Sequence, residues 1–140
     1  MDIIGKLPID VIREYILPYI YLSQSKNLCD DIKSFVTTKR YLINSYIYRY
    51  NFYHDGVDFL IMDICNYIND DKQSPFSYSN DCMMKYRRLF NLQYRTNRHI
   101  YKFVKRIIHT TQPDFSINTQ LGILNPKERE KLVQYIQLRF

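Results

Sequence analysis

The chain has 140 residues, a formal net charge of +6 and 46% apolar residues, which suits one compact domain. Aromatic residues make up 16%, too many for a disordered chain, and the three glycines and five prolines exclude a collagen-like or low-complexity chain. The apolar run Ile16–Leu22 is far shorter than the ~20 residues of a membrane-spanning helix. The first residues also lack the basic and apolar regions of a secretory signal. We therefore expect a protein that neither crosses a membrane nor is secreted.

The spacing of the apolar residues predicts an all-α fold of about seven short helices in a single domain. The predicted helices lie near residues 8–17, 28–36, 37–51, 57–68, 80–90, 96–110 and 125–140. Thr37 or Thr38 can cap the third helix, and Asn125-Pro126 is a typical helix start. The third segment also alternates as a strand would, but its apolar positions cover one helical stripe, which favours a helix.

Three stretches are predicted to be non-helical. His54-Asp55-Gly56 combines turn-forming residues and should break the chain, and residues 69–79 read as a loop. Residues 112–124 read as irregular. A short extended segment is the alternative there, because Phe115, Ile117, Leu121 and Ile123 alternate.

No sequence pattern points to catalysis or to a bound metal. Cys29, Cys65 and Cys82 are too widely spaced for a structural zinc site, and we expect reduced, mostly buried thiols. The three histidines are far apart, and no nucleophile, phosphate-loop or zinc-protease motif is present. We therefore expect no enzyme activity, no cofactor, no metal and no small-molecule substrate.

Positive charge is concentrated in residues 82–113, which carry eight basic side chains and no acidic one, whereas residues 1–81 carry a net charge of −3. The basic residues are Lys85, Arg87, Arg88, Arg95, Arg98, Lys102, Lys105 and Arg106. Such an asymmetry is typical of a surface that meets an acidic partner. These residues form the candidate nucleic-acid site.

Five of these cations share one face of the predicted 96–110 helix. At 100° per residue, they fall within an arc of roughly 100°, opposite the apolar positions. We call them the basic ridge: Arg95, Arg98, Lys102, Lys105 and Arg106. His99 and His109 lie beside it, and Tyr94 and Tyr101 are near enough to stack on bases. The alternative is a solvated face, or one that pairs with the acidic N-terminal half.

The N-terminal third resembles an F-box. The resemblance is carried by Leu7-Pro8-Ile9-Asp10-Val11-Ile12, Ile16, Leu28, Ile32, Phe35-Val36 and Lys39-Arg40-Tyr41. The chain also has no Ala and no Trp, and it is rich in Ile, Asn and Tyr. With this composition it is similar to the short F-box-like proteins of nucleocytoplasmic giant DNA viruses.

The resemblance implies a non-enzymatic interaction module. Residues 1–52 would form a three-helix F-box that docks onto the Skp1 adaptor of a cullin ubiquitin ligase or onto another viral or host complex. Residues 53–140, as part of the same compact domain, would recruit a target. The implied docking residues are Leu7, Pro8, Val11, Ile12, Tyr15 and Ile16. The protein would act in the host cytoplasm, in a viral factory or in the virion. Alternatively, these side chains pack into one closed core with the later helices.

Overall fold

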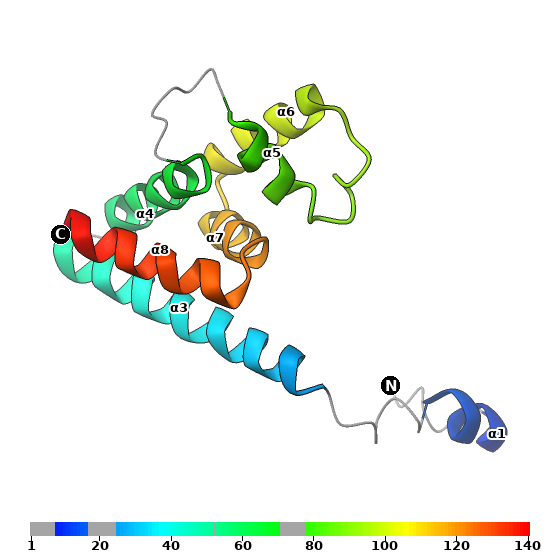
Figure 1. Ribbon diagram of the computed structural model, residues 1–140. Helices are drawn as coiled ribbons and strands as arrows, with labels where there is room; N and C mark the ends of the chain where they lie inside the picture. Colours follow the sequence, from blue (N-terminus) through cyan, green and yellow to red (C-terminus); the bar gives the residue numbers. More distant parts are fainter. Residues whose placement is uncertain (1–7, 17–24, 52, 71–77) are drawn as a thin grey trace. The chain divides into compact units, whose positions relative to one another are not determined.

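The computed structural model describes residues 8–16, 25–51, 53–70 and 78–140, and all regular structure in these ranges is helical (Figure 1). This confirms the predicted all-α fold class. The elements are α1 (Ile9–Val11), the π-helical turn η2 (Ile12–Ile16), α3 (Lys26–Tyr50), α4 (Tyr53–Ile68), α5 (Asn80–Tyr86), α6 (Asn97–Ile108), α7 (Pro113–Gly122) and α8 (Pro126–Arg139).

The chain divides into two compact units, residues 1–30 and 31–140. In the first unit, α1 and η2 form a short helical segment that begins at Pro8, whose carbonyl accepts a hydrogen bond from the Ile12 backbone N–H at 3.2 Å. The predicted end of this helix at Pro18 lies outside the described residues.

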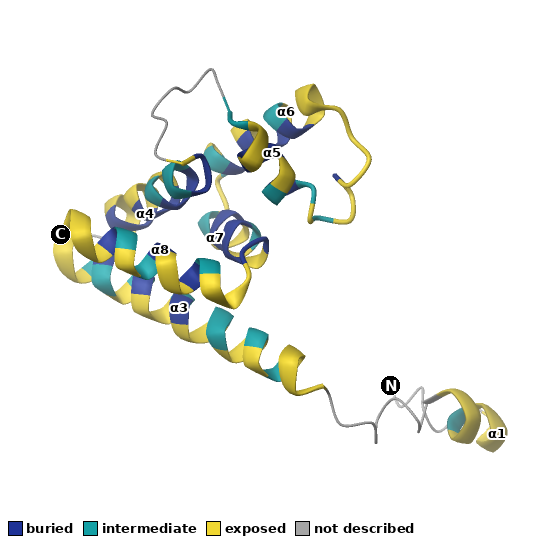
Figure 2. Ribbon diagram, in the orientation of Figure 1, coloured by how far each residue is buried: buried dark blue, intermediate teal, exposed yellow. Residues whose placement is uncertain are grey.

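The centre of the second unit is α4, which contacts α6, α7 and α8. Its buried apolar residues recur with helical spacing, so one broad face is removed from water. They are Val57, Leu60, Ile61, Ile64, Cys65 and Ile68. Figure 2 shows buried residues gathered on α4 and α7, while much of α3 is exposed. The predicted inward stripe of the third helix is partly confirmed, because Leu42 and Tyr46 are fully buried.

The prediction of two helices over residues 28–51 is wrong, because α3 runs unbroken from Lys26 to Tyr50. The stretch contains neither Gly nor Pro, so nothing forces a break. Thr38 is buried inside the helix instead of capping it. The chain reverses only at Asn51, which adopts φ 55°, a left-handed conformation that asparagine tolerates better than most residues.

The predicted break at His54-Asp55-Gly56 is also wrong, because these residues form the first turns of α4. Gly56 is buried where α4 crosses α3. A Cβ atom built on it would lie 2.9 Å from the backbone oxygen of Tyr46. The glycine therefore serves close helix packing and not a turn.

Residues 113–122 form α7, so the irregular or extended segment predicted there is a helix. Pro113 occupies its first turn, where the missing N–H costs nothing. The buried positions are Ser116, Ile117, Gln120 and Leu121, which are spaced as on one helical face although half of them are polar. Because polar Ser116 and Gln120 share the buried face with Ile117 and Leu121, the apolar residues alone do not show the spacing of a helix.

The remaining helices agree with prediction, apart from one end. Thr96 caps α6, and Asn125 caps α8 in a capping box with Glu128. α5 begins after Ser79, which accepts a hydrogen bond from the Cys82 N–H. It ends at Tyr86, before the predicted end at residue 90.

Candidate functional site

The outer face of α6 is the candidate site. Thr96 begins the helix by accepting a hydrogen bond from the His99 N–H at 3.4 Å. Ile100, Phe103, Val104 and Ile107 then fix its orientation, because all four are buried in the core of the second unit. Their spacing leaves the opposite face to water.

All five residues of the basic ridge are exposed. Four of them lie on α6, whereas Arg95 precedes the helix cap Thr96 and lies in the loop. None of them forms an ion pair with an acidic side chain in the part of the chain that the structure describes. The Arg106 guanidinium lies 5.4 Å from the centre of the Phe103 ring. By contrast, the cations outside this ridge that are paired with acids include Lys39, Arg129 and Arg139. The ridge is therefore a concentration of uncompensated positive charge.

An open groove of about 500 Å³ runs between α6 and the preceding loop. Asn91, Leu92 and Arg95 line it from the loop, and His99, Lys102 and Arg106 line it from α6. His99 is exposed, and its Nδ1 lies 2.7 Å from the Thr96 hydroxyl. A negatively charged chain in this groove would meet cations on both sides.

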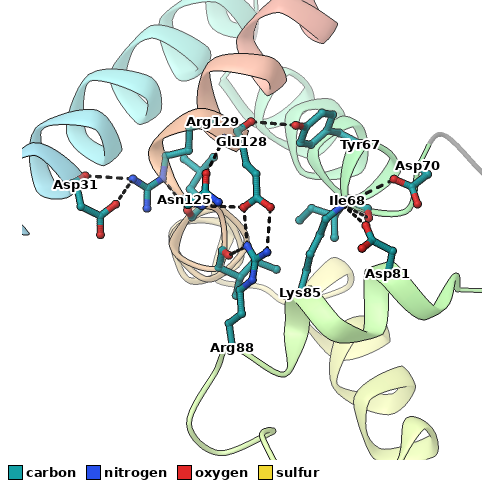
Figure 3. Close-up of polar contacts among 12 residues, drawn as sticks. Asp31, Tyr67, Ile68, Asp70, Asp81, Lys85, Arg88, Asn125, Glu128 and Arg129 are labelled. Carbon is teal, nitrogen blue, oxygen red and sulfur yellow. Dashed lines mark hydrogen bonds and ion pairs between the residues drawn. The ribbon is translucent and has the colours of Figure 1, made fainter. Parts of the chain in front are cut away.

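Lys85 does not belong to this site. Its amine is paired with Asp81 at 2.8 Å and with Asp70 at 3.7 Å, and it donates a hydrogen bond to the Ile68 carbonyl (Figure 3). Burial lowers the pKa of the Lys85 amine, but the two carboxylates outweigh burial, so the net shift is upward. We exclude Lys85 from the predicted nucleic-acid residues because its charge is already neutralised.

Arg88 is likewise committed to the fold. Its guanidinium donates hydrogen bonds to both Glu128 carboxylate oxygens, at 2.5 and 2.9 Å, and to the Ile123 carbonyl (Figure 3). The bond from Arg88 is the main reason that the pKa of Glu128 lies below its ordinary value. The same carboxylate accepts from the Asn125 N–H, so it joins the loop after α5 to the start of α8.

Arg87 shapes the loop beside the groove. Its guanidinium donates to the Arg95 carbonyl at 3.4 Å and to the side-chain oxygen of Asn97. Of the eight predicted cations, three therefore hold the structure together and five remain on the exposed ridge.

Tyr94 and Tyr101, the two aromatic residues predicted to lie near the ridge, differ in how far they are exposed. Tyr94 is 90% exposed in the loop before α6. Tyr101 is only partly exposed, and its ring lies 5.3 Å from that of Tyr78. The exposure of Phe90 was not predicted, because Phe90 was included in the helix expected over residues 80–90. Phe90 is in fact 92% exposed in the same loop as Tyr94.

The predicted docking residues of the N-terminal segment are described only in part. Pro8, Val11 and Tyr15 are exposed, with Tyr15 at 67%, and Ile12 is half-buried. Leu7 and the side chain of Ile16 lie outside the described residues. The apolar core of the described residues is built from Leu42 onward.

Arg129 is a buried side chain for which the sequence pattern gave no role. It donates to the Leu121 carbonyl at 3.0 Å and to the Asp31 carboxylate at 2.6 Å, and so joins α7, α8 and α3 (Figure 3). A single arginine in a charged stretch gives no local signal of such a bridge, since its partners are distant in sequence.

The thiols of Cys65 and Cys82 are buried, and burial raises their pKa values to about 11 and about 12. No group of three or more His, Cys, Asp or Glu side chains is arranged to hold a metal ion among the described residues. Within those same ranges, no helix combines the length and the apolar character needed to cross a membrane.

Comparison with known proteins identifies no relative: no protein-family model, no curated protein and no solved structure matches the chain significantly.

Proposed function

We propose that the basic ridge on α6 binds the phosphate backbone of nucleic acid. The observation that carries this proposal is the exposure of five neighbouring cations, four on one face of α6 and Arg95 in the loop before it, none paired with an acid within the described chain. From Arg98 to Arg106 the helix rises about 12 Å. Phosphates of one duplex strand follow one another at about 3.4 Å along the axis, so this length spans roughly four to five of them.

Binding of this kind depends on counterion release, so it weakens as salt rises. Four to five phosphate contacts should give a slope of log affinity against log salt of roughly −3 to −4.5. The affinity should not depend on sequence, because phosphate contacts position a protein without reading bases. The measurement is fluorescence anisotropy of labelled RNA and DNA at several salt concentrations.

The test variant is Arg98→Glu with Lys102→Glu, which reverses two charges at the middle of the ridge. We expect affinity to fall at least 10-fold for every sequence, because two phosphate contacts become repulsive. Stability should hardly change, since exposed charges contribute little to folding. The matched control is Lys127→Glu with Lys131→Glu, which changes net charge equally at exposed positions on α8. Equal losses in both variants, or no binding by the wild-type chain at low salt, would contradict the proposal.

A second proposal concerns the N-terminal segment, which we propose docks onto the Skp1 adaptor or a related protein. The exposure of Ile9 at 61% and Tyr15 at 67% supports it. Exposed apolar side chains that gather on a short helical segment are typical of a protein contact. Such an interface depends on apolar burial and should be nearly insensitive to salt, unlike the ridge.

Tyr15→Asp tests this second proposal, because an unpaired charge in an apolar contact costs several kcal/mol. We expect it to abolish binding of purified Skp1 adaptor in calorimetry while the helical circular dichroism is kept. Leu138→Asp is the control, since Leu138 is 89% exposed in another part of the chain. Failure of the wild-type protein to bind the adaptor would remove this proposal.

A further inference from the structure

Two aromatic side chains lie almost fully exposed in the loop between α5 and α6. Phe90 is 92% exposed and Tyr94 is 90% exposed. A phenyl ring in water has no polar atom to compensate for its exposed apolar surface. Two aromatic rings within five residues of the basic ridge, one of them without any polar atom, therefore offer flat apolar surface to a ligand of the ridge.

The loop holds these rings on two successive turns. The Leu92 N–H donates to the Leu89 carbonyl at 2.9 Å, and the Arg95 N–H donates to the Leu92 carbonyl at 3.1 Å. Phe90 lies within the first turn and Tyr94 within the second. Leu92, which the turns share, is only 6% exposed and anchors the loop to the core.

Further bonds fix the ends of this loop. The Arg87 guanidinium reaches across it to the Arg95 carbonyl and to Asn97, and Arg88 is held by Glu128. Because the backbone is tied at both ends and in the middle, the loop that carries the rings is held in place. Little backbone entropy therefore remains to be lost when a ligand covers this loop.

The turns that carry the rings also border the groove between α6 and the preceding loop. Phe90 directly precedes Asn91, and Tyr94 directly precedes Arg95, and both Asn91 and Arg95 line the groove. A chain that follows the groove with its phosphates would therefore pass along the loop that carries the two rings. Tyr101 is not part of this surface, because its ring packs on Tyr78.

We propose that Phe90 and Tyr94 form a base-stacking platform that makes the α6 site specific for single-stranded nucleic acid. This inference rests on the proposed function of the ridge. Stacking on an aromatic ring requires an unpaired base, because duplex bases already stack on one another, and it tolerates any sequence because every base has a flat face. Cations for the backbone and rings for the bases together form the usual surface of a single-strand binder.

The chain contains no Trp, so one introduced tryptophan reports on one position. We expect Phe90→Trp and Tyr94→Trp each to be quenched on addition of a 12-nucleotide oligo(U) or oligo(dT), because a stacked base contacts the indole. Leu138→Trp, at an exposed position on α8, should keep its emission. Quenching by oligo(U) alone or by oligo(dT) alone would identify the strand as RNA or DNA within the proposal. Absence of quenching at both loop positions by ligands that do bind would overturn it.

Affinity gives the second readout. The wild-type chain should bind these single strands at least 10-fold more tightly than a 12-base-pair duplex. Phe90→Ala with Tyr94→Ala should remove that preference while leaving duplex affinity and the salt slope unchanged. Phe90→Tyr with Tyr94→Phe should restore it, since both rings are kept. Thermal melts should show both variants folded, because the replaced rings are exposed.

The outcomes separate the two proposals. Salt-dependent binding without a single-strand preference, or an equal loss on single strands and duplex in the alanine variant, would overturn the platform and leave the ridge as a backbone site. The second of these results would also fit a ring inserted between duplex base pairs. No binding of any strand at low salt would overturn the proposed function and the platform together.

Discussion

At the residue scale, Gly56 sets how closely α3 and α4 approach. A Cβ atom there would lie 2.9 Å from the Tyr46 backbone oxygen, which cannot move without shifting a helix. We therefore expect Gly56→Ala to lower the free energy of unfolding by about 1–3 kcal/mol, the usual cost of overpacking. Urea unfolding of the purified chain would measure it.

Gly122→Ala is the matched control, because no atom lies within 4 Å of the added Cβ. Gly122 is the last residue of α7, and Ala is the better helix former by up to about 1 kcal/mol. This variant should be as stable as the wild type or slightly more so. A similar loss of stability in both variants would show that the Gly56 effect is not specific to close packing against Tyr46.

The roles of two single residues could not be predicted from the sequence. Gly56 was interpreted as a chain break, because a glycine that permits a turn and one that permits close packing look identical in sequence. Phe90 was included in the helix predicted over residues 80–90, yet α5 ends at Tyr86. In both cases a tertiary contact or a helix end decided the outcome, and neither is encoded in local periodicity.

At the element scale, the ion pair between Arg88 and Glu128 joins the loop after α5 to the start of α8. The folded state lowers the pKa of Glu128 below its ordinary value of 4.5. Stability from this carboxylate is therefore fully present above pH 4.5 and is lost as the pH falls through the lower, folded-state pKa. Removing the guanidinium should accordingly matter at neutral pH and cease to matter in acid.

Arg88→Gln tests this link. Because the Arg88 side chain is 43% exposed, we expect only about 1 kcal/mol of destabilisation at pH 7. Urea unfolding at pH 7, 5 and 3 should show the difference from wild type shrinking in the most acidic sample. Lys127→Gln, which removes a neighbouring exposed charge, should show no such pH dependence. A difference that stays constant with pH would assign the effect to the Ile123 carbonyl bond instead.

Local signals predicted elements better than they predicted contacts between elements. The start of α8 could be predicted from Asn125, Pro126 and Glu128, whose capping interactions span three residues. The bond from Arg88 to Glu128 spans 40 residues, and no pattern in one sequence indicates it. The same holds for the candidate site: helical spacing predicted the five ridge cations, whereas the commitment of Lys85, Arg87 and Arg88 to the fold depends on long-range partners.

At the scale of the whole molecule, the basic side chains fall into two groups, those paired with acids and those left exposed on the basic ridge. Basic side chains near the helix junctions pair with acids and hold elements together, as Arg88 and Arg129 do. The basic ridge has no such partners among the described residues. Its five cations therefore repel one another, and this repulsion destabilises the folded state. A phosphate chain would remove that repulsion, and binding should therefore raise the thermal midpoint, by an amount that grows with the logarithm of the ligand concentration.

The closing helix α8 contributes buried side chains to the core of the second unit. Leu132 and Ile136 are fully buried, and Arg129 bridges α8 to α7 and α3 from a buried position. Burial of two such apolar side chains contributes roughly 3–6 kcal/mol, a large share of the ~5–15 kcal/mol that stabilises a typical domain. Removal of residues 125–140 should therefore leave a molten state. We expect residual helical circular dichroism, strong binding of a hydrophobic dye and no cooperative thermal transition.

The control is Leu138→Ala, which alters an exposed position of the same helix and should melt like the wild type. A cooperative transition in the truncated chain would show instead that the core is complete without α8.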